Sequence, residues 1–202
     1  MARLSAWSNN LLANLYIKNI LEEVANAKRK GRPIYCESQC GFDGRLLTPE
    51  IAKLLKKARF RMARIAWDGP LAQYKEIKRQ LDLLVEAGYS NRDIFIFMIY
   101  NWQIGFSEMD KKRRKCWEWK VQIADCRFRP LDQLHDNYKP RKAQTNNAYY
   151  IHENWTDELV KRFRKNVRAQ NICVRMGFKK YIKTMENMGR RNREIRKKSC
   201  CK

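Results

Sequence analysis

Residues 94–100 read IFIFMIY, a run of seven apolar residues that follows a helical stretch ended by Gly88. Both faces of a strand with this composition are apolar, and strands of this kind are typical of parallel sheets whose two faces are covered. Residues 94–100 therefore predict a buried strand in a parallel sheet, and we expect helices in the flanking sequence to cover it.

The sequence on both sides of this strand alternates between amphipathic helices and short apolar strands. Thr48-Pro49-Glu50 supplies an N-cap and a first-turn proline, which is how many helices begin. Strands separated by helices imply right-handed βαβ crossovers. The sequence thus predicts an α/β fold with further strands at residues 34–39, 64–67 and 121–125, and helices at residues 17–25, 48–58, 71–84, 107–117 and from 156 onward.

Composition excludes several classes of protein. No apolar stretch is long enough to span a membrane, and residues 1–10 lack the apolar run of a signal peptide. The seven cysteines are odd in number and irregularly spaced, so they do not indicate a disulfide framework. We therefore expect a cytoplasmic protein with reduced thiols.

The net charge of +23 is concentrated near the C-terminus. Residues 161–202 hold 16 Lys and Arg against two acidic residues, Glu186 and Glu194, a surplus of +14. Clustered basic residues either form a solvated helix face or release counterions from nucleic-acid phosphates. The candidate nucleic-acid contacts are Lys179, Lys180, Arg190 and Arg191.

The pattern divides the chain into four parts. Residues 1–130 form the α/β region, and residues 131–154 are a polar loop in which Tyr149 and Tyr150 are expected to be exposed. Residues 155–188 form a basic C-terminal helical segment that Thr156 caps, and residues 189–202 are a flexible basic tail.

Polar residues recur where the expected strands end, the place where parallel α/β proteins bind ligands. Each could also be a simple cap or turn residue. The candidate ligand-binding residues are Glu37, Gln39, Asp68 and Asn101; Asp125, Arg127 and Arg129 at the end of the last strand are candidates for a substrate contact or a lid.

Two long stretches resemble a known family. CESQCGFDGRLLTPEIAKLLKKARFRMARIAWDG (residues 36–69) and IKRQLDLLVEAGYSNRDIFIFMIYNW (residues 77–102) are similar to the later strands and helices of radical S-adenosylmethionine (radical SAM) enzymes. The resemblance covers roughly residues 7–130 and implies a partial (βα) barrel that binds S-adenosylmethionine and a 4Fe-4S cluster. It also implies that Glu37, Gln39, Asp68 and Asn101 line the S-adenosylmethionine pocket.

The family's C-x3-C-x2-C cluster motif is absent from this sequence. Cys36 and Cys40 match its first interval, but position 43 is Asp43. We therefore expect a truncated or split radical SAM-like protein that is inactive alone, with the cluster-binding half on a separate chain. The alternatives are a nucleic-acid-binding accessory protein that uses the basic C-terminal region, and an unstable fragment.

Overall fold

The chain is represented by a computed structural model, which describes residues 3–6 and 10–178. The strands are β1 (Arg3–Ala6), β2 (Lys28–Arg29), β3 (Arg32–Pro33), β4 (Tyr35–Ser38), β5 (Arg64–Ala66), β6 (Phe95–Tyr100) and β7 (Gln122–Arg127). The α-helices are α1 (Ile17–Asn26), α2 (Pro49–Lys57), α3 (Tyr74–Glu86), α4 (Phe106–Glu118) and α5 (Asp157–Arg175). Four 3-10 turns lie between them: η1 (Leu11–Ala13), η2 (Gly44–Leu46), η3 (Leu71–Gln73) and η4 (Asn91–Asp93).

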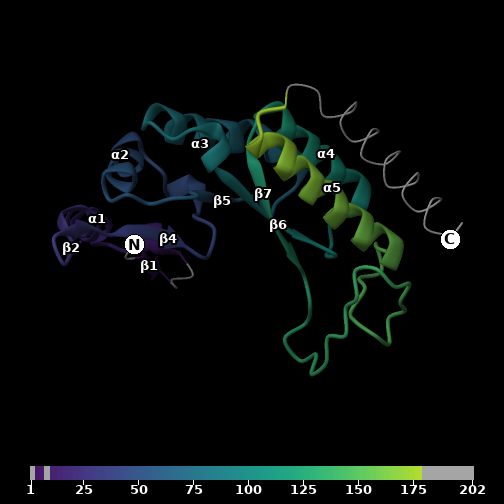
Figure 1. Cartoon of the computed structure of the whole chain (residues 1–202). Coiled ribbons are helices and arrows are strands. Elements are labelled where there is room, and N and C mark those ends of the chain that lie inside the picture. The colour runs from purple at the N-terminus through teal and green to yellow at the C-terminus, as the bar shows by residue number, and fades with distance from the viewer. Residues whose placement is uncertain (1–2, 7–9, 179–202) are drawn as a thin grey trace, which may run out of the picture.

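Apart from the short β2–β3 pair, the described strands pair in parallel, as the sequence predicted. Strands β5, β6 and β7 form a three-stranded parallel sheet in that order, and β1 pairs in parallel with β4. Two parallel bridges, Cys36 to Phe60 and Phe42 to Ile65, connect the β4 region to the β5 region. Helices α1 to α4 lie between strands along the chain and α5 follows the last strand (Figure 1), so the predicted mixed α/β fold with parallel strands is confirmed.

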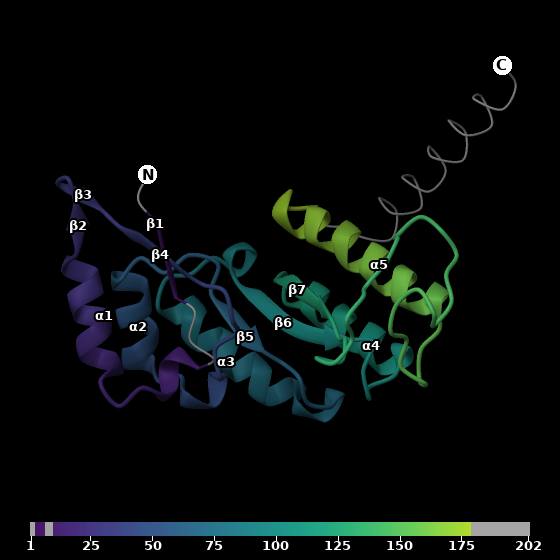
Figure 2. The same cartoon turned by 90° about the horizontal axis from the view of Figure 1, so that it is seen from below.

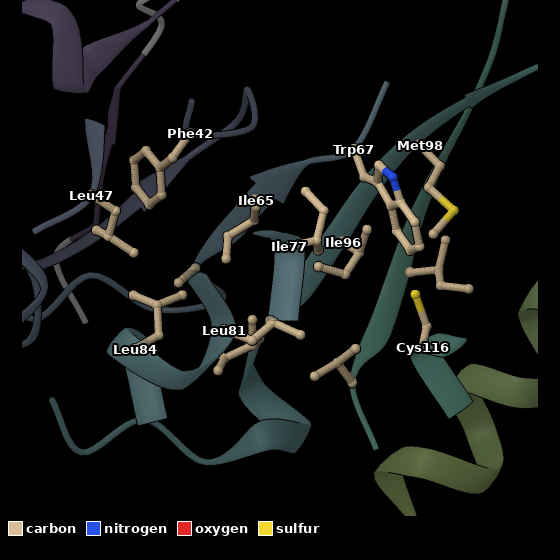
Figure 3. Close-up of a cluster of buried hydrophobic side chains, with 14 of the residues drawn as sticks. Phe42, Leu47, Ile65, Trp67, Ile77, Leu81, Leu84, Ile96, Met98 and Cys116 are labelled. Carbon is tan, nitrogen blue, oxygen red and sulfur yellow. The ribbon is translucent and has the colours of Figure 1, made fainter. Parts of the chain in front are cut away.

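Strand β6 has two different faces. Ile96, Met98 and Tyr100 are buried, whereas the side chains that alternate with them are only half buried. Figure 3 shows Ile96 close to Ile77 of α3, and Met98 beside Trp67, within the buried cluster. One face of β6 is therefore part of the core, and the other face is partly open.

The helix starts follow the local sequence signals. Thr48 Oγ1 accepts a hydrogen bond of 3.2 Å from the backbone N–H of Ile51, and α2 begins at Pro49. Thr156 caps α5 in the same way through the N–H of Leu159. Helix α5 packs against α4 and β7, so the end of the described chain returns to the sheet (Figure 2).

One element was missed. The sequence indicated only that Lys28–Gly31 and Pro33 end the first helix, but the chain forms a short antiparallel hairpin from β2 and β3. Lys30 and Gly31 form its turn, with φ values of 50° and 75°. A tight turn of this kind requires positive φ at both central residues, and lysine at the first of them is a weak sequence signal.

The long connection between β7 and α5 contains no helix or strand, but it is well packed. Tyr149, which the sequence predicted to be exposed, is fully buried. Its hydroxyl donates a hydrogen bond of 2.8 Å to Asp157 Oδ1 at the start of α5, and its ring lies 5.0 Å from that of Tyr138. The prediction for Tyr149 was wrong because the packing partners lie outside the loop's local pattern.

Two sequence predictions concern the C-terminal residues. Lys179, Lys180, Arg190 and Arg191 lie outside the described residues, as do the expected basic tail and the last part of the expected helical segment.

Within residues 3–6 and 10–178, none of the helices has the length and apolar character needed to cross a bilayer.

Candidate functional site

A cavity of about 600 Å³ lies where β4 and β5 end. We call it the strand-end cavity. The loop after β4 contributes Gln39 and Cys40, the turn after β5 contributes Asp68, and the first turns of α3 contribute Glu76 and Gln80. Its apolar surface includes Ile77 and Phe97, the latter from the partly open face of β6. The cavity therefore combines polar strand ends with an apolar wall, as ligand sites of parallel sheets do.

Gln80 is the most unusual residue of the cavity. Its side chain is 2% exposed, and Nε2 donates a hydrogen bond of 3.0 Å to Glu76 Oε1. Because that partner is a carboxylate, the amide orientation is determined, and Oε1 is left without a hydrogen-bond partner among the residues that the structure describes. A buried carbonyl oxygen without a partner is costly, so a ligand that donates a hydrogen bond to it would gain affinity.

Gly44 allows the Gln80 side chain to reach this position. A Cβ atom at Gly44 would lie 1.8 Å from Gln80 Oε1, so any other residue at position 44 would displace the amide. Asn10 adds a second buried oxygen to the same cavity, because its Oδ1 also lacks a hydrogen-bond partner within residues 3–6 and 10–178. In the described part of the chain, the strand-end cavity therefore presents two unsatisfied acceptors.

The acidic groups of the cavity differ in their surroundings. Asp43 accepts hydrogen bonds from the Arg45 side chain at 2.8 and 2.6 Å, and these bonds lower the pKa of its carboxyl group. Glu76 accepts bonds from Arg79 and Gln80, which lower its pKa to about 2. Both carboxylates already have donors within the chain. Asp68 has no hydrogen-bond donor among the bonds described, so it is the carboxylate best placed to receive one from a ligand.

Asp68 lies beside a buried lysine. Although the Asp68 side chain is open to the cavity, loss of water around it raises its pKa, and the Lys112 ammonium offsets part of that rise. Lys112 is 1% exposed and donates hydrogen bonds to the carbonyl oxygens of Trp67 (2.7 Å) and Gly69 (2.9 Å). Burial lowers the pKa of Lys112 to about 8. Lys112 thus binds the backbone on both sides of Asp68 and holds the turn in place.

Two of the four predicted ligand-binding residues, Gln39 and Asp68, line the strand-end cavity. Glu37 does not. Its carboxylate pairs with Arg64 Nη2 at 2.6 Å, and both side chains are largely buried between β4 and β5. Glu37 therefore joins neighbouring strands, which is the role that its position one residue before the strand end allows.

Asn101 is also outside the cavity and holds the long loop. It is fully buried, and its Nδ2 donates to the carbonyl oxygens of Tyr150 (2.8 Å) and Phe128 (3.3 Å). Its Oδ1 accepts from the N–H of His152 at 3.1 Å. Asn101 has a φ of 61°, a conformation that asparagine tolerates better than most residues.

The residues predicted at the end of the last strand lie on β7 and just after it. Arg127 forms an ion pair with Asp136, and Arg129 Nη1 lies 3.8 Å from the same carboxylate. Burial raises the pKa of Asp125, while Arg164 and Arg168 of α5 act against that rise. None of Asp125, Arg127 and Arg129 lines the strand-end cavity. Arg127 connects β7 to the long loop through Asp136, and Arg129 contacts the same carboxylate from within the loop.

The described cysteines do not fit a 4Fe-4S cluster. Cys36 is buried in the core, where burial raises the pKa of its thiol, whereas Cys40 lines the strand-end cavity. Among the residues that the structure describes, no three His, Cys, Asp or Glu side chains are grouped as metal ligands. A cluster needs at least three thiolates in matched positions, which these residues do not provide.

Sequence reasoning missed Gln80, Asn10 and Lys112. Gln80 lies between the apolar positions Ile77 and Leu81 on the inner side of α3, and a polar residue there is a weak signal of a buried site. Lys112 lies in the basic run KKRRK (residues 111–115), whose members all suggest solvent exposure.

Comparison with protein-family models and with curated proteins finds no match to this chain, so the strand-end cavity itself is the basis for assigning a function.

Proposed function

We propose that this chain binds S-adenosylmethionine in the strand-end cavity. The observation that carries the proposal is the buried, unpartnered Gln80 Oε1 in the same cavity as Gln39 and Asp68. Those two residues were selected from the sequence by the resemblance to radical SAM domains, whereas Gln80 was not. Independent features of the chain therefore point to the same cavity.

The chemistry of the cavity matches this ligand. S-adenosylmethionine carries an ammonium group, ribose hydroxyls and an adenine amino group, all of which donate hydrogen bonds. Asp68, Asn10 Oδ1 and Gln80 Oε1 are acceptors for such donors. Ile77 and Phe97 offer apolar contact for the adenine ring. In this proposal Asp68 binds a cationic or hydroxyl group, and the two amide oxygens bind the remaining donors.

The strand arrangement supports the interpretation of this chain as part of a radical SAM-like (βα) barrel. The order β5-β6-β7, with β1 beside β4, is what successive strands of a partial (βα) barrel would give. In this interpretation a separate, cytoplasmic chain carries the cluster-binding cysteines, and bound S-adenosylmethionine would supply the radical precursor when that chain is present. Since the described cysteines do not fit a cluster, the role we assign to this chain is binding, and no reaction step is assigned to it.

The test is a Gln80→Met variant, titrated with S-adenosylmethionine by isothermal calorimetry. Methionine keeps the length and apolar body of the side chain but removes the acceptor. We expect the affinity to fall at least tenfold, in line with the loss of one buried hydrogen bond. The stability of the free protein should change by no more than about 1 kcal/mol, because the substitution removes an unsatisfied oxygen as well as the bond to Glu76.

Gln103 offers a matched control, since it is exposed and does not line the cavity. Gln103→Met should bind S-adenosylmethionine with unchanged affinity. Equal affinities for the Gln80 variant and the native chain, or no binding by the native chain, would contradict the proposal.

A further inference from the structure

A second concave surface lies between α5 and the loop that precedes it. This groove, which we call the α5 groove, has a volume of about 950 Å³. Seven Lys and Arg residues line it: five on α5 between Lys161 and Arg168, and two on the loop, Arg141 and Lys142. Only two acidic residues, Asp157 and Glu158, face them. The groove thus carries a strong positive surplus on two opposing walls.

Much of this charge is not neutralised by the described part of the chain. Arg141, Lys142 and Lys165 are exposed, and they form no ion pair with any described residue. One of the two acidic residues of the groove is already paired, because Asp157 Oδ1 lies 2.5 Å from Lys161 Nζ. Although burial acts to raise the pKa of Asp157, the hydrogen bonds from Lys161 and Tyr149 hold it below its usual value. Asp157 therefore stays ionised and does not compete for the three exposed cations.

Hydrogen bonds hold the loop wall in position. Lys161 donates a hydrogen bond to the carbonyl oxygen of Lys142, and the N–H of Gln144 donates to Asp157 Oδ2 at 3.1 Å. The Tyr149 hydroxyl donates to the other oxygen of the same carboxylate at 2.8 Å. Figure 2 shows the loop beside the first turns of α5. The two basic walls are therefore arranged before any ligand binds, which lowers the cost of binding.

We propose that the α5 groove binds the phosphodiester backbone of a nucleic acid. A backbone is a narrow chain of regularly spaced anions, and it can contact the basic residues of both walls at once. A bilayer surface is flat or convex on this scale and would reach only the rims of a concave groove. Basic positions 161, 165 and 168 recur on one side of α5 over about 10 Å, at the helical rise of about 1.5 Å per residue. Successive phosphates can therefore be contacted along the helix. This site is separate from the strand-end cavity and does not depend on its ligand.

The test uses the full chain and a fluorescein-labelled single-stranded oligouridine, with binding followed by fluorescence anisotropy over a range of salt concentrations. The variant is Arg141→Glu/Lys165→Glu, which reverses one charge on each wall. We expect at least a tenfold loss of affinity at moderate salt. The slope of log K against log salt should fall by about 1.4, the value expected for two lost contacts to a single strand.

The control reverses two charges elsewhere. Lys53 and Lys57 are exposed on α2 and form no ion pair with described residues, so Lys53→Glu/Lys57→Glu changes the net charge equally. This variant should bind within twofold of the native chain. Equal losses in the two variants would overturn the assignment to the groove, as would a native chain that does not bind. Competition by polyglutamate as strong as by unlabelled oligouridine would overturn the preference for nucleic acid.

Discussion

We expect the free energy of unfolding of the native chain, relative to that of a Lys112→Met variant, to rise by about 3 kcal/mol between pH 8 and pH 10.5. Burial lowers the pKa of Lys112 to about 8 in the folded chain, whereas the unfolded value is 10.5. Between these values the unfolded state binds the proton and the folded state does not. Raising the pH therefore favours the folded state, and this contribution is lost as the pH falls through 8.

Methionine replaces the four-atom aliphatic part of the Lys112 side chain but cannot titrate, so the difference between the two proteins isolates this one group. The carbonyl oxygens of Trp67 and Gly69 lose their donor in the variant, which adds an offset that does not vary with pH. Urea unfolding at a series of pH values measures the difference. If the difference in unfolding free energy between the two proteins stayed constant from pH 8 to 10.5, Lys112 would titrate as an exposed lysine. A buried ammonium group would then not hold the turn around Asp68.

The Asn101→Ala variant should lose about 3 kcal/mol of unfolding free energy. Three hydrogen bonds to the long loop are removed, and the loop carbonyl oxygens of Phe128 and Tyr150 lose a buried donor. Alanine is also strained at a φ of 61°. Urea denaturation measures the loss, and limited proteolysis should cut first within residues 131–154, because Asn101 holds that loop to the end of β6.

Asn101→Gly separates the two causes. Glycine removes the same hydrogen bonds but accepts a positive φ, so this variant should be about 1 kcal/mol more stable than Asn101→Ala. If both variants were as stable as the native chain, the hydrogen bonds of Asn101 would not anchor the loop.

The regular elements were largely predictable because their signals are local. The apolar run IFIFMIY became β6, and the caps Thr48 and Thr156 begin α2 and α5 where the sequence indicated. Signals of this kind depend on residues a few positions apart, which one segment contains. The hairpin of β2 and β3 was missed because Lys30 occupies a turn position that usually has Gly or Asn.

The site was predicted in part, since its geometry depends on residues far apart in the chain. The ends of parallel strands lie at one edge of a sheet, and this rule correctly brought Gln39 and Asp68 into one cavity. The same rule could not show that Glu37 has Arg64 as its cross-strand partner, or that Asn101 binds a loop about 50 residues away in sequence. The role of Gln80 could not be predicted from the sequence, because its burial depends on the absence of a side chain at Gly44.

The most direct test of the proposed function is the NMR spectrum of the side-chain amide groups during titration with S-adenosylmethionine. The spectra of Gln80→Met and Asn10→Ala variants assign the two resonances of interest. Because the carbonyl oxygens of Gln80 and Asn10 have no partner among the described residues, we predict that their amide resonances shift with the titration and reach saturation together. Saturable binding with both resonances unmoved, or no binding by the native chain, would contradict the account.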